Sequence, residues 1–481
     1  MLRRTKIIAT LGPSTEGKEQ IHALSEAGMN IARLNFSHGT YEQFKKIAKN
    51  IRAVAKEDEK IITIMQDLQG PKIRIGDLGK AGWDAEEVKV KKGEIIKFTS
   101  KAKPKTSKKS SGKTSIVIPI PYPLLTKVLK KGDSLLIEDG LIRTKIVSIK
   151  DNSLRAKVIS GGIIKSRKGV NIPDSKLPAS ASLTSKDKKD LAFGVKTLKV
   201  DAIAVSFVED AEDLRRIRRE IQKHSKRPIK VIAKIERREA LRNLKEILKE
   251  ADGVMVARGD LGIETKAERV PIEQKRILTM ARSQGKPTII ATQILQSMVE
   301  NPLPTRAEVS DAAHAIFELA DAFMLSNETA VGRFPVRAVK TLARVARETE
   351  NAIFKNTDLF PIQTSKDPDL VEDEAMALSA ARIAEEIDAE AIVVLTKEGF
   401  TARTVLKHRP KTPVIVITNS KDTAQNLNFL WGIKEIILHK GVFRSEEIKT
   451  FLKKTDQVKR GDEIILIKLS NTKRSLVEMK I

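Results

Sequence analysis

The sequence of 481 residues contains no cysteine, which excludes disulfides, thiolate metal sites and cysteine nucleophiles. Aromatic residues make up only 4% of the chain, so few side chains can stack on the bases of single-stranded nucleic acid. No apolar run approaches the roughly 18 residues that a membrane span needs. The apolar stretch after Arg3 and Arg4 is too short for the core of a signal peptide. We therefore expect a globular protein of the cytoplasm with no membrane partner.

Positive charge is abundant, with 89 lysines and arginines against 62 aspartates and glutamates and a net charge of +27. Such a field attracts nucleic acids, anionic membrane surfaces or small anionic metabolites. The excess is mostly dispersed, and the densest patch is Lys101–Lys113, which has six lysines and no acid. We interpret this patch as a solvated loop, with nucleic-acid contact as the alternative. No specific nucleic-acid partner is expected.

Short apolar, β-branched runs alternate with amphipathic segments of helical period over the first 350 residues. Parallel strands need crossover helices, and eight β/α units close a barrel. The sequence therefore predicts an α/β fold, a (β/α)8 TIM barrel. The eight expected strands are Lys6–Thr10, Asn30–Phe36, Ile61–Leu68, Ala202–Val208, Lys230–Ile235, Gly253–Ala257, Pro287–Thr292 and Ala322–Ser326.

The alternation is interrupted once and resumes in a second form near the end. Between Gly70 and about Gly169 the chain is rich in Val, Ile, Gly, Pro and Lys without long helical periodicity, which predicts an inserted all-β domain. The polar stretch Lys355–Asp369 is typical of a linker, and a smaller C-terminal α/β domain follows it. The expected boundaries are 1–70 and 170–352 for the barrel, 71–169 for the insertion and 353–481 for the C-terminal domain.

Polar residues gather at the carboxyl ends of the expected strands, which is where barrel enzymes carry out their chemistry. A single such residue is more often a cap or a turn residue, but seven strand ends of this kind are hard to explain as turns. The side chains concerned are Arg33, Asn35, Ser37, His38, Asp67, Ser206, Lys234, Glu236, Arg258, Asp260, Thr292, Ser326 and Glu328.

The residue types fit one kind of chemistry. Glu236 and Asp260 offer the two carboxylates that proteins usually contribute to a magnesium site, and Lys234 adds a fixed positive charge. Arg33 and Arg74 can hold a phosphate or a carboxylate in bidentate fashion. A metal, a lysine and two arginines around one point are typical of phosphoryl transfer.

Longer motifs resemble those of the pyruvate kinase family in order and spacing, over roughly residues 5–350 and more loosely beyond. They are TKIIATLGPST, GMNIARLNFSHG, DLQGPKIR, KIE, MVARGDLGIE, ATQILQSM and PTRAEVSDAA followed by ADAFMLSNETAVG. The resemblance implies a barrel, a β-barrel lid inserted after the third strand and a C-terminal α/β domain for regulation and oligomerisation. It also implies a homotetramer that transfers phosphate from phosphoenolpyruvate to ADP, giving pyruvate and ATP in glycolysis.

The resemblance assigns the metal and the phosphoryl group to five side chains. Glu236 and Asp260 match the magnesium ligands, with Mn²⁺ as an alternative metal. Lys234 matches the cation that stabilises the phosphoryl group and the enolate. Arg33 would contact the phosphoryl group, and Arg74 would support it or the phosphates of the nucleotide.

The same resemblance assigns the rest of the substrate and the proton transfer. Thr292 and the amides of Gly259 and Asp260 would hold the substrate carboxylate, and Ser206 would also bind substrate. Ser326 and Glu328 would belong to the relay that protonates the enolate. Asn35 and His38 would join Arg74 at the nucleotide, and Asp139 in the lid matches a residue that faces the site.

A monovalent-cation site is implied at Asn35, Ser37, Asp67 and the carbonyl of Leu68. Lys72 stands where a glutamate accompanies potassium dependence in the family and a lysine accompanies independence. An ammonium there places its own charge near the potassium position, so we expect potassium not to be required.

Two positions depart from the family pattern. Asn327 stands where the family usually has glycine, and we expect a left-handed backbone there, which asparagine tolerates. In the C-terminal domain, the phosphate-loop position Thr396–Thr401 contains Glu398, which would repel a phosphate, beside Lys397, which would attract one. The allosteric effector, if one exists, therefore stays open.

Two alternatives to the kinase remain. One is another magnesium-dependent enzyme that acts on an enolate, such as a phosphoenolpyruvate mutase or an acid lyase, but these lack the inserted lid and the separate C-terminal domain. The other is a basic nucleic-acid-associated protein on an inactive scaffold, which would require loss of the catalytic positions. Lys234, Glu236, Asp260 and Arg33 are all present.

Overall fold

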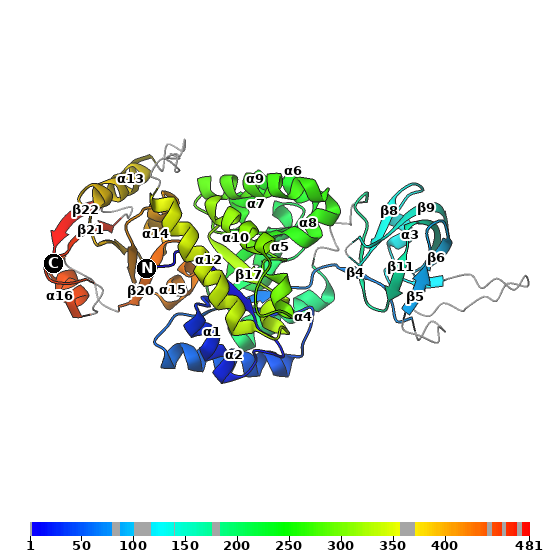
Figure 1. Cartoon of the computed structure of the whole chain (residues 1–481), viewed down its shortest axis with the longest axis horizontal. Coiled ribbons are helices and arrows are strands. Elements are labelled where there is room, and N and C mark those ends of the chain that lie inside the picture. Colours follow the sequence, from blue (N-terminus) through cyan, green and yellow to red (C-terminus); the bar gives the residue numbers. More distant parts are fainter. Residues whose placement is uncertain are drawn as a thin grey trace, which may run out of the picture.

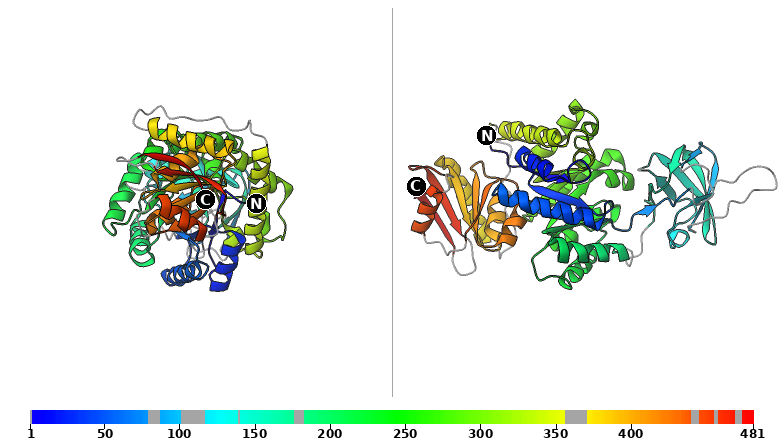
Figure 2. Two further views of the ribbon diagram at one scale, coloured as in Figure 1. Left: turned by 90° about the vertical axis from the view of Figure 1, so that its left-hand side faces the viewer. Right: turned by 90° about the horizontal axis from the view of Figure 1, so that it is seen from below.

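The computed structural model describes residues 2–78, 87–100, 117–138, 140–175, 183–355, 371–439, 445–454, 458–468 and 474–481. The patch Lys101–Lys113, Asp139 and all but the first residue of the expected linker lie outside these ranges. Three bodies follow one another in a row, with the barrel in the middle (Figures 1 and 2). No helix in the described ranges is long and apolar enough to cross a membrane.

Eight parallel strands close into a barrel in the order β1-β17-β16-β15-β14-β13-β3-β2, which confirms the expected fold. Their residues are buried almost without exception, because helices cover the outside while side chains fill the inside. The strands are β1 (Lys6–Thr10), β2 (Ile31–Asn35), β3 (Thr63–Asp67), β13 (Ala202–Val205), β14 (Lys230–Ile235), β15 (Gly253–Ala257), β16 (Thr288–Ala291) and β17 (Ala322–Leu325).

Amphipathic helices surround the barrel, and several begin at side chains that satisfy the free N–H groups of the first turn. Thr40 and Gln43 form a capping box at the start of α2, and Thr305 and Glu308 form one at α10. The apolar periodicity of Arg237–Lys249 predicts one helix, but the structure has two helices that meet at Asn243. The helices are α1 (Lys18–Ala27), α2 (Tyr41–Glu57), α4 (Ser185–Phe193), η3 (Gly194–Leu198), α5 (Ala211–Gln222), α6 (Arg238–Arg242), α7 (Leu244–Glu250), α8 (Arg258–Glu264), η4 (Ala267–Arg269), α9 (Val270–Ser283), η5 (Gln296–Val299), α10 (Arg306–Phe317), α11 (Asn327–Ala330) and α12 (Pro335–Lys355).

The chain between β3 and β13 forms two sheets with a core of their own, on the carboxyl-terminal side of the barrel strands. Seven strands follow the order β4-β12-β8-β9-β10-β6-β7, and β11 pairs with β5. The elements are β4 (Ile73–Arg74), β5 (Glu87–Val90), β6 (Ile95–Thr99), β7 (Val117–Pro119), α3 (Leu125–Val128), β8 (Ser134–Ile137), β9 (Ile142–Lys150), β10 (Ser153–Ser160), β11 (Gly162–Lys165) and β12 (Gly169–Asn171).

The C-terminal part is a five-stranded sheet in the order β20-β19-β18-β21-β22, in which β22 alone is antiparallel. The sequence predicts strands at Ala391–Thr396, Pro413–Thr418, Glu435–His439, Glu463–Leu469 and Leu476–Ile481. The structure has strands close to these, namely β18 (Ala391–Leu395), β19 (Val414–Thr418), β20 (Ile433–Leu438), β21 (Glu463–Lys468) and β22 (Ser475–Lys480). The sequence predicts two helices in this domain, at Asp373–Glu386 and Thr401–His408, so α15 and α16 were not expected. The helices are α13 (Val371–Glu386), α14 (Phe400–Lys407), α15 (Lys421–Leu427) and α16 (Ser445–Lys454).

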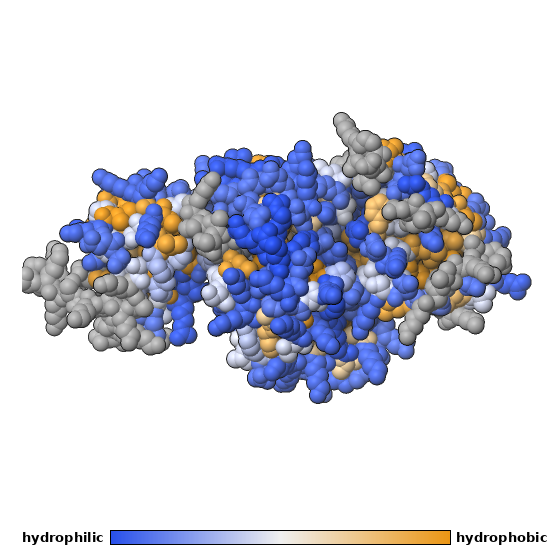
Figure 3. Space-filling model, turned by 180° about the vertical axis from the view of Figure 1, so that it is seen from behind, coloured by the Kyte–Doolittle hydropathy of each residue, from blue (hydrophilic) through white to orange (hydrophobic). Residues whose placement is uncertain are grey.

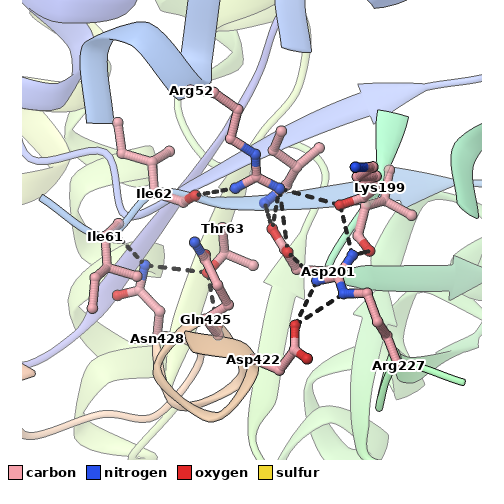
Figure 4. A network of polar contacts seen from close by, with 12 residues as sticks. Arg52, Ile61, Ile62, Thr63, Lys199, Asp201, Arg227, Asp422, Gln425 and Asn428 are labelled. Carbon is pink, nitrogen blue, oxygen red and sulfur yellow. Dashed lines mark hydrogen bonds and ion pairs between the residues drawn. The ribbon is translucent and has the colours of Figure 1, made fainter. Parts of the chain in front are cut away.

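The C-terminal sheet domain joins the amino-terminal end of the barrel through polar contacts (Figure 4). Arg227 donates to Asp201, which precedes β13, and to Asp422 of α15, at 3.1 and 2.7 Å. The backbone oxygen of Gln425 accepts a hydrogen bond from Thr63 at 2.7 Å. Asn428 donates to two backbone oxygens of the barrel. Because these groups are buried or half-buried and satisfied, they fix the two domains to each other.

One aromatic side chain from the C-terminal domain enters the barrel. Phe429 is 1% exposed and belongs to the apolar cluster that fills the barrel interior, together with Met65, Met255 and Met324. The interior is therefore a packed column that begins at the amino-terminal junction. It ends beneath the polar side chains at the carboxyl ends of the strands.

Candidate active site

A cavity of about 190 Å³ opens at the carboxyl ends of the barrel strands. It is lined by residues that follow or end seven different strands or connect to the insertion. The residues singled out from the sequence that line it are Arg33, Asn35, Ser37, His38, Asp67, Lys72, Arg74, Ser206, Lys234, Glu236, Asp260, Thr292 and Ser326. The structure thus brings together side chains that are far apart in the sequence, such as Arg33 and Ser326, which are 293 positions apart.

A chain of alternating charges forms the floor of the cavity. Arg33 contacts Asp67 at 2.7 Å, and Lys234 lies 3.3 Å from Asp67 and 2.9 Å from Glu236. Lys234 also donates to the Ser206 hydroxyl at 2.6 Å. Each member is buried or nearly so, with Asp67 and Glu236 at 1% exposure. Buried charges in this arrangement are held because each has an opposite partner.

The protonation states follow from this chain. Burial by itself would lower the pKa of the Lys234 ammonium, but the charges of Asp67 and Glu236 outweigh burial and raise it. Burial opposes the charged form of Asp67 too, yet Lys234 and Arg33 hold its pKa below the ordinary value. Lys234 is therefore a permanent cation at neutral pH and cannot serve there as a base.

The two expected metal ligands lie at the ends of adjacent strands. Glu236 follows β14 and is held by Lys234 and by the N–H of Phe207 at 2.7 Å. Asp260 lies in the first turn of α8 after β15 and contacts the Lys72 ammonium at 3.2 Å. Burial raises the pKa of Glu236, and the negative charge of Asp260 raises it further. The positive charge of Lys234 opposes this but does not outweigh it. Two carboxylates that repel each other fit a divalent cation placed between them.

No group of three or more His, Cys, Asp or Glu side chains that could hold a metal occurs in the part of the chain that the structure describes. A metal at Glu236 and Asp260 would therefore take its other ligands from water and substrate. Magnesium commonly binds in this manner, through one or two carboxylates, because it keeps several waters.

Thr292 has a strained backbone next to the metal-ligand candidates. Its φ is 69°, a left-handed conformation that is rare for a β-branched residue. Its hydroxyl accepts a hydrogen bond from the Gly259 N–H at 2.9 Å. Arg258, which pairs with Asp311 at 2.7 Å, also donates to the Thr292 carbonyl. Strain of this kind persists only where the surroundings enforce it, which is common at functional sites.

The Glu328 carboxylate accepts hydrogen bonds from backbone N–H groups and forms none with the Ser326 hydroxyl. Its two oxygens accept N–H groups from Leu295 at 3.2 Å and Ser326 at 2.7 Å, and the side chain is 1% exposed. Glu328 therefore positions the loop that carries Ser326. The expectation of a left-handed Asn327 is wrong, because Asn327 is the first residue of α11 and has helical geometry.

Of the expected monovalent-cation residues, Asn35, Ser37 and Asp67 line the cavity and Leu68 does not, and the oxygen atoms of Asn35, Asp67 and Leu68 already have protein partners. Asn35 Oδ1 accepts the Ser37 N–H at 3.1 Å, and the Leu68 carbonyl accepts the Ser206 hydroxyl at 2.8 Å. Lys72 lines the same cavity, although its ammonium contacts Asp260 and none of these groups by a hydrogen bond.

Two expected phosphate or nucleotide contacts lie at the cavity wall. Arg74 is on β4 and donates to the Arg167 carbonyl at 3.0 Å. The His38 side chain is exposed at the edge of the cavity. Partial desolvation, and then the charges of Arg74, Arg33 and Lys72, lower its pKa. A neutral His38 among three cations makes this wall of the cavity attractive to anions.

Sequence reasoning missed some of the lining. Gln69, Phe207, Met255, Ala257, Ala291 and Met324 also line the cavity. Phe207, with φ of 57°, supplies the N–H that fixes Glu236. A backbone donor and an apolar floor leave no recognisable sequence signal.

The barrel, with paired cations and carboxylates at its carboxyl end, defines an enzyme of the (β/α)8 class that handles an anionic substrate. Family models described as "Pyruvate kinase, barrel domain" and "Pyruvate kinase, alpha/beta domain" match residues 2–339 and 374–476. The chain therefore belongs to the pyruvate kinase family and is a phosphotransferase.

Similar proteins cover most of the chain. Pyruvate kinase 2 of Synechocystis sp. is 42% identical over 438 residues, which are 91% of this chain and 71% of that protein. The pyruvate kinase of Thermotoga maritima is 39% identical over 470 residues, 97% of this chain and 96% of that protein. The crystal structure of a pyruvate kinase from Cryptosporidium parvum has a TM-score of 0.87 at 32% identity and covers 99% of this chain and 96% of that one.

Proposed function

We propose that this enzyme transfers the phosphoryl group of phosphoenolpyruvate to ADP, giving pyruvate and ATP in glycolysis. The observation that carries the proposal is the cation Lys234, buried between Asp67 and Glu236 and lining the cavity. A fixed cation stabilises charge on the moving phosphoryl group and on the enolate that remains. The bond between phosphorus and the enol oxygen breaks, one to the terminal phosphate of ADP forms, and the enolate carbon takes a proton.

Individual residues have separate tasks in this proposal. Arg33, held by Asp67 and by the Thr10 hydroxyl at 2.8 Å, presents its guanidinium to the phosphoryl group. Thr292 and the amide of Gly259 receive the substrate carboxylate. Ser326, whose loop Glu328 positions, gives the route for the proton. Ser206 keeps the Lys234 ammonium aimed into the cavity.

Glu236 and Asp260 would hold Mg²⁺, which the family generally uses, with Mn²⁺ as an alternative. When bound, the metal supplies positive charge for the phosphate oxygens. The Phe207 N–H and the Lys234 ammonium each contact one oxygen of the Glu236 carboxylate, so the carboxylate is held in one orientation toward the metal. The Glu236 carboxylate is therefore positioned before substrate arrives.

A neighbouring cavity of about 450 Å³ suits the nucleoside of ADP. It shares Arg33, Asn35, His38 and Ser326 with the reaction site, so a nucleotide in it would reach the phosphoryl group. Its remaining lining is partly apolar, with Leu11, Pro13, Phe44, Ile47 and Val331, which suits a base and ribose. Arg74 would contact the phosphates from the side of the insertion.

Lys72 is proposed to replace potassium. Its ammonium lies in the cavity that Asn35, Ser37 and Asp67 also line, and it contacts Asp260. One positive charge supplied by the chain removes the need for a bound monovalent cation. Wild-type activity is expected to persist in buffer containing tetramethylammonium as the only monovalent cation, while Lys72→Glu is expected to require potassium.

The control for this experiment is Lys168→Glu, which changes charge by the same amount at a side chain that pairs with Glu138 in the insertion. Rates are measured with and without potassium at constant ionic strength. Loss of wild-type activity without potassium, or a Lys72→Glu enzyme that remains indifferent to potassium, would contradict the role of Lys72.

The inserted sheets are proposed to act as a lid that closes over nucleotide and metal and excludes water. The assembly is proposed to be a homotetramer in the cytoplasm. Exposed apolar side chains include Ile272, Leu303 and Phe317 on the barrel and Val477 on the C-terminal sheet. Figure 3 shows hydrophobic residues on the surface of the C-terminal domain, whereas the barrel face in that view is mainly hydrophilic.

The overall function is tested by following pyruvate formation from phosphoenolpyruvate, ADP and Mg²⁺ in a coupled assay. We expect robust turnover that stops when the metal is chelated. Absence of pyruvate formation together with strong DNA binding would replace the kinase with the nucleic-acid alternative.

A further inference from the structure

Three neighbouring strands of the insertion carry positive charge on their outer face. The side chains of β6, β9 and β10 alternate between a buried set, which packs in the core of the insertion, and an exposed set. The exposed set contains no acid and six cations, of which Lys150 adjoins Asp151 in the turn after β9. The other five form what we call the basic face: Lys97, Arg143, Lys145, Arg155 and Lys157.

The register of these strands places like charges directly opposite each other. Lys157 of β10 is the cross-strand partner of Lys145 on β9, and Arg155 of β10 is the partner of Lys97 on β6. Like charges in such positions repel each other and destabilise a sheet. Within the described part of the chain, no member of the basic face forms an ion pair with a carboxylate. The repulsion is therefore not offset by neighbouring side chains.

A surface helix of the barrel shows that missing partners are not a general result of the net charge. The cations of α5 and of the residue that follows it each have a carboxylate partner. Arg215 and Arg219 pair with Glu212, Arg216 with Asp213, Arg218 with Asp252, and Lys223 with Glu220. The chain thus neutralises a dense group of surface cations on the barrel but leaves the basic face of the insertion unpaired.

The positive charge continues from the basic face toward the barrel. Arg143 and Lys145 also line a cleft of about 1300 Å³ between the insertion and the barrel. The charged side chains in its described lining are Arg143, Lys145, Arg238, Arg258, Lys266, Glu268 and Asp311. Because Asp311 pairs with Arg258, four cations remain against one carboxylate. A cleft with an excess of one charge concentrates the field and attracts an extended anion.

We propose that the basic face binds the phosphate backbone of double-stranded nucleic acid, independently of base sequence. Its cations extend over about five residues of a strand and three strands, a stripe of roughly 17 by 10 Å. A duplex carries one negative charge for about every 1.7 Å of its axis, so several phosphates lie over such a stripe at once. A small anion would neutralise one or two of the cations and leave the others without a partner.

The composition of the face favours a duplex over a single strand or a membrane. No aromatic residue occupies an exposed position of β6, β9 or β10, so unpaired bases find no stacking surface there. The apolar side chains exposed on these strands are Ile95 and Ile159. Two isoleucines without a tryptophan or tyrosine provide little surface for insertion among lipid headgroups. The insertion also lies at the end of the molecule away from the C-terminal domain, so that domain does not cover it (Figure 1).

The binding is tested by fluorescence anisotropy of the full-length enzyme with a labelled DNA duplex of arbitrary sequence, between about 50 and 200 mM salt. The test variant combines Lys145→Gln, Arg155→Gln and Lys157→Gln. Each lost phosphate contact lowers the slope of log affinity against log salt by about 0.9, so the slope should fall by about 2 to 3. Affinity at the lowest salt should fall about tenfold or more. Lys97→Gln combined with Arg143→Gln, which removes the other two cations, should change both quantities in the same direction.

The matched control combines Arg215→Gln, Arg219→Gln and Lys223→Gln on the barrel. It removes the same net charge from cations that already have partners, so its slope should stay that of the wild type. The segment Lys101–Lys113 is left unchanged in every variant. Thermal unfolding shows that each protein is folded, and the test variant should be at least as stable as the wild type because it loses two like-charge pairs.

The comparison of ligands decides between a duplex and the other anions. A second duplex of unrelated sequence should bind equally, and the single strand and vesicles containing phosphatidylserine should bind more weakly. A wild type that does not bind the duplex, a test variant that binds as well as the control, or tighter binding of the single strand or the vesicles would overturn the proposal. Pyruvate formation is measured separately, since the binding does not depend on the proposed function.

Discussion

The two ends of the barrel carry the same kinds of charged side chain and use them differently. At the carboxyl end, Lys234 and Glu236 line an open cavity, so part of their charge can face a ligand. At the amino end, Asp201 accepts from Arg52, Arg227 and a backbone N–H, and the surrounding groups link two domains (Figure 4). An ion pair is structural where its charges serve only contacts between protein groups, as at Asp201. It becomes available for chemistry where one side is left open.

The largest expected effect comes from removing the central cation of the carboxyl end. Lys234→Met should lower kcat roughly 10³-fold or more, because the transition state loses a fixed positive charge. It should also lower stability, since Asp67 and Glu236 lose a buried partner. Steady-state kinetics and thermal unfolding measure both. Lys223→Met, at a lysine that is 64% exposed and paired on the surface, is the control and should change neither.

The opposite pattern is expected for the buried ion pair at the amino end. Arg409 contacts Asp321 at 2.8 Å, and both side chains are 5% exposed. Arg409→Met should lower the free energy of unfolding by about 3–5 kcal/mol, since a buried carboxylate loses its partner. Catalytic constants measured well below the unfolding temperature should stay within twofold of wild type.

A double variant sharpens this second case. Arg409→Met combined with Asp321→Leu should recover part of the lost stability, because no buried charge is then left alone. Urea denaturation measures the difference. Arg409→Met as stable as wild type would contradict a purely structural role of this ion pair at the amino end of the barrel. Loss of turnover in folded Arg409→Met would contradict it too.

The C-terminal domain should show a smaller, pH-dependent effect at the end of α14. Burial, with Lys407 adding to it and Glu374 opposing it, lowers the pKa of His408 from 6.5 to about 4. The folded protein thus favours neutral His408. Its contribution to stability is complete above pH 6.5 and is lost as the pH falls toward 4, up to about 3 kcal/mol.

Urea midpoints between pH 7.5 and 4 for wild type and His408→Gln test this expectation. The difference between the two proteins should change over that window, because only the wild type must keep a buried imidazole neutral. A constant difference would mean that His408 titrates normally in the folded state.

The smallest expected effect is at the strained corner of the carboxyl end. Thr292→Val removes the hydroxyl that accepts the Gly259 N–H and should raise the KM for phosphoenolpyruvate about tenfold. Thr292→Ser keeps the hydroxyl and should stay near wild type. Steady-state kinetics compare them, and equal behaviour of the two variants would mean that the hydroxyl plays no part in substrate binding.

Much of the barrel could be predicted because its signals are local. Runs such as Lys230–Ile235 and Gly253–Ala257 are apolar, β-branched and bounded by turn residues, and both are strands with those bounds in the structure. The strand ends were predictable for the same reason, since alternation decides which side chains share a face. The short helices α15 and α16 were missed because their apolar periodicity is brief.

The sequence by itself determined the closed barrel, the separate C-terminal sheet and the kinds of side chain at the carboxyl ends of the strands. The tertiary structure alone decided that Glu328 accepts backbone N–H groups, that Lys72 pairs with Asp260 and that Phe429 packs in the barrel interior. The physical reason is range. Periodicity and turn chemistry act over a few residues, whereas ion pairs and cavities depend on segments that folding alone brings together.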